Sequence, residues 1–147
     1  MKKSNGDHQS GLSDLVLHAG ILERISDAFI ALDKKDCFTY VNRKAGEIFQ
    51  RNPDEMKGLN IWKEFPRGVG HAFQQACEKA MREQQYVYLE DYYISYDKWF
   101  ESHIYPSTEG LSVFFRDITD RKKTEEKLNK SNRLYNFISQ VNQLIRS

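Results

Sequence analysis

The sequence predicts an α+β domain: a five-stranded antiparallel sheet with short helices over one face, flanked by an N-terminal amphipathic helix and a C-terminal helix. Three observations support this. Two β-like segments precede a helical region and three more follow it, an order typical of α+β domains. Short turn-like linkers join neighbouring β-like segments, as in hairpins. Helical spacing of apolar residues returns at both ends of the chain. We expect the domain over residues 27–119 and the C-terminal helix over residues 120–147.

The chain before the domain divides into two parts. Residues 1–11 are polar and lack an apolar run, so we expect them to be disordered. Residues 12–26 carry apolar side chains at helical spacing, which predicts an amphipathic flanking helix. The apolar residues of this helix are Leu15, Leu22 and Ile25.

A β-hairpin is predicted for the first two strands. The apolar run at 28–33 and the β-rich run at 37–42 are joined by Asp-Lys-Lys-Asp at 33–36, a typical turn composition. Asn42 then stands between a strand and a helix. Its side chain has two interpretations: an N-cap that accepts a hydrogen bond from the helix, or a polar group at the mouth of a ligand pocket.

Short helices are predicted after this hairpin. Residues 43–50 place apolar side chains on one helical face. A second helix is indicated by Asn52 as N-cap, Pro53 at the first helical position and Gly58 at its end.

The remaining part of the central region contains a connector and a longer helix. We interpret residues 59–66 as a short apolar connector that stops at Pro66. A longer helix follows, with an apolar stripe that includes Phe73, Ala76 and Ala80. We expect Val69 to begin this stripe.

Three more strands are predicted at 86–94, 98–106 and 110–119, joined by short turn-like linkers. In the middle strand the side chains alternate between two faces. One face carries Trp99, Glu101, His103 and Tyr105, and the other carries Phe100, Ser102 and Ile104. The many aromatic residues of these strands exceed what one face of a small core uses, which predicts an interface.

The last strand is expected to continue into a charged helix without a turn residue between them. At this point Asp117 and Thr119 are expected to accept hydrogen bonds from the free backbone amides of the helix start. Asp117 and Asp120 also lie favourably at the positive end of the helix dipole. Further along, apolar residues spaced 4, 3 and 4 apart form a coiled-coil-like stripe, which consists of Leu134, Ile138, Val141 and Ile145.

Net charge, cysteine positions, apolar run lengths and absent motifs argue against several classes of protein. The net charge of +1 argues against a nucleic-acid-binding protein. Cys37 and Cys77 fit neither a disulfide framework nor a metal site, which indicates a reducing, cytoplasmic compartment. No apolar run approaches the roughly 20 residues of a membrane span. We find no catalytic triad, phosphate loop or metal cluster, so no enzymatic activity is expected of this chain.

Three segments of the sequence resemble a PAS sensory domain. They are "AFIALDKKDCFTYVNRKAGEIF" near the start, "KWFESHIYPSTEGLSVFFRDIT" near the end, and "RDITDRKKTEEKL", which is similar to the D-I-T signature where the PAS fold continues into a signalling helix. The resemblance covers about residues 20 to 125. The segment "RLYNFISQVNQLI" resembles the helix that precedes further signalling modules in bacterial sensors, so we expect the chain to be part of a longer protein.

The resemblance implies a sensory and dimerisation module of a bacterial signal-transduction protein. A ligand- or interaction-driven change would pass through a signal junction to an output domain in the same parent chain, first of all a histidine kinase. The junction residues would be Arg116, Asp117, Ile118, Thr119 and Arg121, with Arg116 or Arg121 paired to Asp117. Two alternatives stay open: a ligand-free structural dimerisation domain, and a sensor for a diguanylate cyclase or phosphodiesterase.

The expected ligand position is the space between the sheet and the helices. Its candidate residues are Asn42, Phe49, Trp62, Phe65 and Phe73. The alternative for the four aromatic residues is that they form part of the hydrophobic core and bind no ligand. We also expect a homodimer, whose interface candidates are Leu15, Leu22, Ile25, Leu134, Ile138 and Val141.

The cofactor is unknown, and the sequence argues against haem and flavin. His71 is out of register with the histidine that binds haem in some PAS domains. Flavin-binding photosensory relatives carry a reactive cysteine in a segment that here reads "NRKAGEIFQ", without cysteine.

Overall fold

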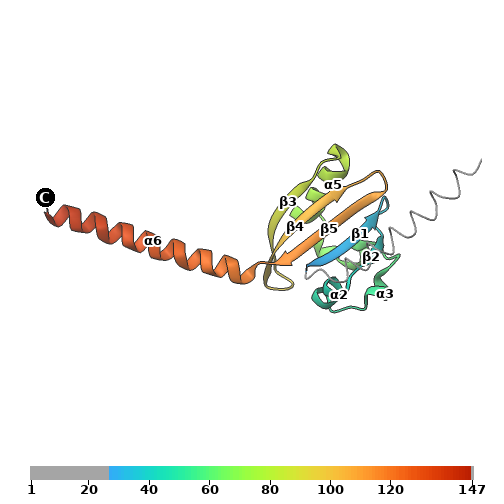
Figure 1. Cartoon of the computed structure of the whole chain (residues 1–147), viewed down its shortest axis with the longest axis horizontal. Coiled ribbons are helices and arrows are strands. Elements are labelled where there is room, and N and C mark those ends of the chain that lie inside the picture. Colours follow the sequence, from blue (N-terminus) through green and yellow to red (C-terminus); the bar gives the residue numbers. More distant parts are fainter. Residues whose placement is uncertain (1–26, 147) are drawn as a thin grey trace, which may run out of the picture. The chain divides into compact units, whose positions relative to one another are not determined.

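The computed structural model describes residues 27–146; the predicted disordered segment 1–11 and flanking helix 12–26 lie outside this range, as does the end of the predicted segment 120–147. The described chain is α+β, as predicted (Figure 1). Its elements are β1 (Ala28–Asp33), β2 (Phe38–Val41), α2 (Arg43–Phe49), α3 (Pro53–Met56), α4 (Ile61–Glu64), the 3-10 helix η1 (Pro66–Gly68), α5 (Ala72–Glu83), β3 (Val87–Tyr93), β4 (Lys98–Pro106), β5 (Gly110–Asp117) and α6 (Thr119–Arg146).

The strands form one five-stranded sheet in the order β2-β1-β5-β4-β3. β1 pairs antiparallel with both β2 and β5. Side chains alternate along β1, so one face of the β1–β5 pair is apolar and buried. Its opposed pairs are Ala28 with Phe115, Ile30 with Val113, and Leu32 with Leu111.

The same alternation is confirmed in β4. Phe100, Ser102 and Ile104 are all buried; on the other face Tyr105 is 47% exposed, but Glu101 is 9% exposed and departs from the alternation in burial. At the other end of the β4–β5 turn, Gly110 has a φ of +152°, and a Cβ built there would lie 1.9 Å from the carbonyl oxygen of Leu32. Only glycine fits this close approach of β5 to β1.

The chain forms two compact units. The first, here called the sheet unit, comprises the described residues 27–89 and 102–116. The second, the junction unit, comprises residues 90–101 and the described part of 117–147. Residues 90–101 are the hairpin segment, which ends β3 and begins β4. The boundaries therefore fall within β3, within β4 and near the end of β5.

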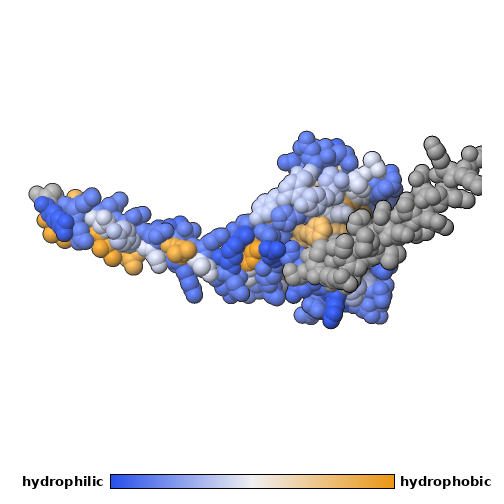
Figure 2. All heavy atoms as spheres, in the orientation of Figure 1, coloured by the Kyte–Doolittle hydropathy of each residue, from blue (hydrophilic) through white to orange (hydrophobic). Residues whose placement is uncertain are grey.

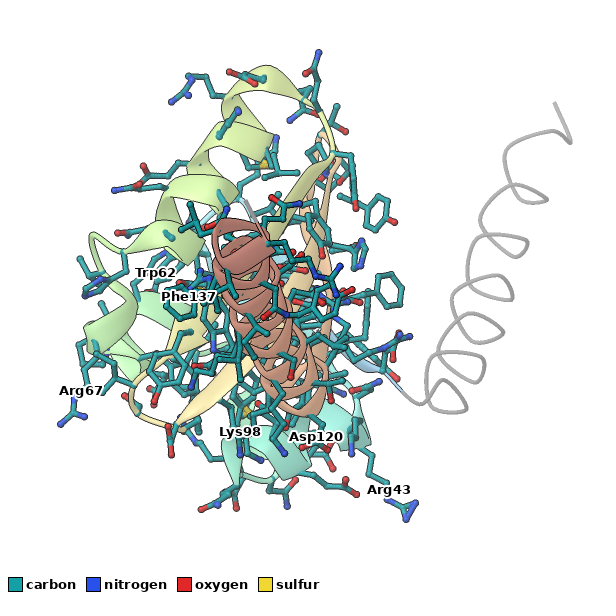
Figure 3. All side chains as sticks on the ribbon, turned by 90° about the vertical axis from the view of Figure 1, so that its left-hand side faces the viewer. Arg43, Trp62, Arg67, Lys98, Asp120 and Phe137 are labelled. Carbon is teal, nitrogen blue, oxygen red and sulfur yellow. The ribbon has the colours of Figure 1, made fainter. Side chains whose placement is uncertain are left out.

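Within the sheet unit, short helices pack on the strands. α2 contacts β1, and α3 contacts β2. α5 runs alongside the strands in two views (Figures 1 and 3), and its residues Ala76, Cys77 and Ala80 are buried. A ring cluster continues the core: Phe65 contacts Phe38 and Phe49, and Phe49 contacts Phe115.

Two predictions for the central region are wrong. Residues 59–66 are more than a connector, because Asn60 Oδ1 accepts hydrogen bonds from the backbone N–H groups of Trp62 and Lys63 and thereby caps α4. Val69 does not begin the long helix and is 50% exposed. Gly70, with a φ of +80°, adopts a left-handed conformation that interrupts any helix there, so α5 begins at Ala72.

The junction unit contains one long helix, α6, of 28 residues. Its first turns are charged, and hydrophobic groups appear further along it (Figure 2). Large exposed apolar side chains on this helix include Leu134, Phe137 and Ile138. Over the part of the chain that the structure describes, no helix combines the length and apolar character that crossing a membrane requires.

Candidate functional site

The candidate site is the point where β5 gives way to α6, residues 117–121, together with the hairpin segment. Only Ile118 separates the strand from the helix. Its backbone N–H donates to the carbonyl oxygen of Trp99 at 2.8 Å, and its own carbonyl accepts from the N–H of Lys122 at 2.9 Å. Ile118 is buried. One residue thus bonds both to β4 and to the first turn of α6.

The hydroxyl group of Thr119 links the helix to the hairpin segment. It donates to Asp117 Oδ1 at 2.6 Å and accepts from the backbone N–H of Trp99 at 3.0 Å. Asp117 Oδ1 also accepts from the backbone N–H of Thr119 at 2.9 Å. The prediction that Asp117 caps the helix start is confirmed. The prediction for Thr119 is wrong in its partner, because its hydroxyl accepts from β4 and not from the helix.

Asp117 has a cationic partner that the sequence did not indicate. Its Oδ2 lies 3.5 Å from Nζ of Lys98, the first residue of β4. Burial would raise the pKa of Asp117, but the hydrogen bonds from Thr119 and the neighbouring Lys98 ammonium outweigh it and lower the pKa below its ordinary value. Figure 3 looks nearly along α6 and labels Lys98 and Asp120 of this unit.

Arg121 forms ion pairs with three carboxylates. Its Nη2 donates to Glu90 of β3, its Nη1 donates to Glu101 of β4 at 3.2 Å, and its Nε lies 3.5 Å from Glu125 of α6. The Glu101 side chain is only 12% exposed. Arg121 therefore connects the helix to both strands of the hairpin segment.

Lys122 makes a second connection to the same strands. Its Nζ lies 2.7 Å from Glu90 and 3.7 Å from Glu125. The hydrogen bond to Glu90 raises the pKa of Lys122 above its ordinary value. The ammonium group also lies 5.0 Å from the ring centroid of Trp99, a cation–π contact.

Arg116, also expected at the junction, belongs to the sheet unit and bonds within it. Its Nε and Nη2 donate to the two carboxylate oxygens of Asp27, at 2.9 and 3.0 Å. This bidentate pair joins the end of β5 to the start of β1. The partners found for Arg116, Arg121 and Asp117 thus include four residues that sequence reasoning did not assign to the junction: Asp27, Glu90, Lys98 and Glu101.

Asn42, a pocket candidate, is bonded on all sides. Its Oδ1 accepts from the backbone N–H of Phe29 at 3.0 Å and of Ala45 at 2.9 Å, and its Nδ2 donates to the carbonyl of Asp27 at 3.0 Å. It is 1% exposed. The N-cap interpretation is confirmed, and the role at a pocket mouth stays a prediction.

The four aromatic pocket candidates fall into two contacting pairs. The rings of Phe49 and Phe65 lie 5.0 Å apart, and those of Trp62 and Phe73 lie 6.0 Å apart. All four side chains are half-buried. Their role in ligand binding stays a prediction.

His71, Cys77 and His103, the other titratable residues weighed as site candidates, lie outside residues 117–121 and the hairpin segment. His71 is exposed and precedes α5. Burial raises the pKa of Cys77 to about 12, so its thiol is protonated at neutral pH. His103 Nδ1 lies 2.6 Å from the hydroxyl of Tyr86. The described residues hold no group of three or more side chains arranged to bind a metal ion.

The dimer-interface candidates are only partly within the described range. Leu15, Leu22 and Ile25 lie outside it. Leu134 and Ile138 are exposed on α6, and Val141 is partly exposed. Their role in dimerisation stays a prediction.

Solved structures share this fold. A sensory box sensor histidine kinase from Vibrio cholerae is 14% identical, with a TM-score of 0.57 over 77% of this chain and 98% of that chain. The PAS domain of histidine kinase ThkA is 20% identical, with a TM-score of 0.53 over 63% of this chain and 100% of that chain. At these identities the likeness shows the fold alone.

A longer structure, ThkA in complex with the response regulator protein TrrA, is 21% identical, with a TM-score of 0.64 over 87% of this chain and 40% of that chain. No curated protein matches the sequence. The family model described as PAS fold matches residues 22–123, which is most of the chain and includes both the sheet and the strand–helix junction. The chain therefore belongs to the PAS-fold family.

Proposed function

We propose that this chain is the sensory and dimerisation module of a bacterial sensor histidine kinase. In this proposal a ligand or a protein interaction changes the sheet unit, and residues 117–121 pass the change to α6 and on to a kinase domain. The chain itself carries no catalytic role.

The observation that carries the proposal is the bonding of Thr119. A single hydroxyl joins the first residue of α6 to Asp117 at the end of β5 and to Trp99 in β4. β3, β4 and β5 all pass from the sheet unit into the junction unit. A distortion of these strands therefore has a covalent and hydrogen-bonded path to the helix. Such a device needs two states that differ by only a few kcal/mol, so that a modest input shifts their populations.

The apolar stripe of α6 supports dimerisation. Leu134, Ile138, Val141 and Ile145 recur at coiled-coil spacing on a continuous helix, and Ile145 is 77% exposed. Packing the stripes of two copies together would remove this apolar surface from water. Two helices in one coiled coil also give a change at the junction a way to alter their relative position.

The choice of a histidine kinase as the output domain rests on the descriptions of solved structures that share this fold. Similar structures are described as a sensor histidine kinase and as the PAS domain of a histidine kinase. The signalling alternative, a sensor for a diguanylate cyclase or phosphodiesterase, differs from this proposal in the output domain.

The transmission step is tested by joining the full chain in frame to a histidine-kinase core and measuring autophosphorylation. We expect Asp117→Ala to change the autophosphorylation rate severalfold, because it removes the hydrogen bonds to Thr119 and the Lys98 pair. Asp120→Ala is the matched control: Asp120 lies at the same end of α6, and its carboxylate has no partner among the described residues. Circular dichroism establishes that both variants fold.

A wild-type rate in Asp117→Ala, or the same change in Asp120→Ala, would contradict the proposal.

Native mass spectrometry of the purified chain addresses sensing separately. A bound small molecule supports ligand sensing. An unliganded chain that dimerises favours the structural dimerisation domain, an alternative consistent with the contacting rings of Phe38, Phe49, Phe65 and Phe115.

A further inference from the structure

The guanidinium group of Arg121 divides its three nitrogen atoms among three elements. Nη2 donates a hydrogen bond to Glu90 of β3, Nη1 donates one to Glu101 of β4, and Nε forms an ion pair with Glu125, one turn further along α6. The guanidinium group is planar and its N–H directions are fixed, so it reaches all three carboxylates at once only in a narrow range of positions. The hydrogen bonds to β3 and β4 favour positions of the helix from which the Arg121 side chain reaches both strands.

The charges around Arg121 make this arrangement sensitive to its removal. Two cations, Arg121 and Lys122, face three carboxylates, those of Glu90, Glu101 and Glu125. Without Arg121, one ammonium group would face three negative charges. The Glu101 side chain is only 12% exposed, and the loss of a cationic partner from a nearly buried carboxylate is costly. Repulsion would then favour other positions of the first helical turn.

Lys122 reports which position the helix adopts. Its ammonium group lies 5.0 Å from the ring centroid of Trp99, which belongs to the hairpin segment. A rotation of α6 moves Lys122 away from the face of this ring. Protons above an aromatic ring resonate upfield, so the Lys122 side-chain resonances respond to such a rotation.

We propose that Arg121 is a positioning residue that sets the rotational position of α6 relative to the hairpin segment. The three-way bonding defines one state of the helix, and loss of Glu90 or Glu101 from this bonding defines a second. The positioning role of Arg121 does not depend on the proposed function, but its use in signalling does. In a PAS sensor, the rotational position of α6 that Arg121 favours would be the change passed to the output domain.

The test is NMR spectroscopy of the full chain, which follows the Lys122 side-chain protons. In the wild type we expect them upfield of the other lysines. Arg121→Lys keeps the positive charge but has no planar fork, so we expect the upfield displacement to fall by roughly half or more. Arg121→Gln with Glu101→Gln removes the charge without leaving a buried carboxylate unpaired, and we expect the displacement to be lost.

The matched control is Lys130→Gln. Lys130 pairs with Glu126 at 3.3 Å within α6 and contacts no strand through this pair. We expect the Lys122 resonances to stay at their wild-type positions in this variant. Urea unfolding establishes that each variant is folded.

Wild-type Lys122 resonances in Arg121→Lys would overturn the proposal, because the backbone bond from Ile118 to Trp99 and the Thr119 hydroxyl would then suffice to position the helix. The same loss of upfield displacement in Lys130→Gln would also overturn it. Since no output domain is present, the result does not depend on transmission. If Asp117→Ala leaves kinase output unchanged, the proposed function fails while the positioning role of Arg121 stands or falls on the NMR result.

Discussion

At the scale of single residues, Thr119 is held from two sides, because its hydroxyl both donates to Asp117 and accepts from Trp99. We expect Thr119→Val, which has the same shape without the hydroxyl, to reduce the free energy of unfolding by about 1–2 kcal/mol. Thr119→Ser keeps the hydroxyl and should change it by about 0.5 kcal/mol or less. Urea titration measures both. Equal losses in the two variants would mean that the methyl group, and not the hydroxyl, stabilises the junction.

Asp117 gives the junction a pH dependence with a defined sign. Its pKa is lower in the folded chain than its ordinary value, so the stabilisation that its carboxylate supplies is complete above about pH 4, the ordinary range of an aspartate pKa. It is lost as the pH falls through the lowered pKa. We expect the difference in free energy of unfolding between wild type and Asp117→Asn to be constant from pH 5 to 8 and to shrink in more acidic solution. A difference that grows on acidification would contradict this assignment.

The thiols should differ sharply in reactivity. With its pKa raised to about 12, the buried Cys77 has almost no thiolate at pH 8. Cys37 is only partly buried. We expect a thiol reagent at pH 8 to modify Cys37 first and Cys77 only on unfolding, as mass spectrometry of the labelled chain would detect. Fast labelling of Cys77 in the folded chain would show that α5 opens locally.

At the scale of elements, the strands were the most predictable part of the molecule. The bounds predicted for β1 and β4 agree with the structure, because alternating apolar residues and flanking turn residues are local signals. The boundary between the last strand and the helix was predicted less accurately: the strand was expected to run to residue 119 but ends at Asp117, and the helix begins at Thr119. α4 was missed because an Asn60 cap before four residues is a weak signal beside the apolar character of the segment.

The junction bonds could not be read from the sequence. Lys98 and Asp117, Trp99 and Thr119, and Glu90 and Arg121 are each about 20 to 30 residues apart. Local periodicity places each of these residues on an element but not opposite its partner. The resemblance in the D-I-T segment identified the position of the junction, whereas its partners required the pairing of β3, β4 and β5.

The proposed dimerisation through α6 is tested within its apolar stripe. Substituting Ile138 with Lys introduces a charge into the middle of the stripe. Burying an isoleucine side chain is worth about 1.5–3 kcal/mol, so we expect the dimer dissociation constant to rise at least about tenfold. Tyr135→Lys is the control, because Tyr135 is exposed and lies outside the stripe. Sedimentation velocity compares them, and an unchanged dimer in Ile138→Lys would remove α6 from the interface.

At the scale of the whole molecule, association is expected to need more than α6. The stripe from Leu134 to Ile145 covers fewer than two full heptads, shorter than the three or four that specify a coiled coil. The sequence predicts a second contribution from residues 12–26. We therefore expect deletion of residues 1–26 to weaken self-association in analytical ultracentrifugation. The same dimer with and without these residues would exclude that contribution.

Transmission from the sheet unit to the output domain is tested most directly by a double-mutant cycle on the kinase fusion. Phe65→Leu alters the ring cluster of the sheet unit. Asp117→Ala removes the hydrogen bonds to Thr119 and the ion pair with Lys98. We expect Phe65→Leu to change the autophosphorylation rate in the wild-type background and to have little effect in the Asp117→Ala background, a coupling of more than about 0.5 kcal/mol. If Phe65→Leu changes the rate by the same factor in both backgrounds, the signal does not pass through residues 117–121.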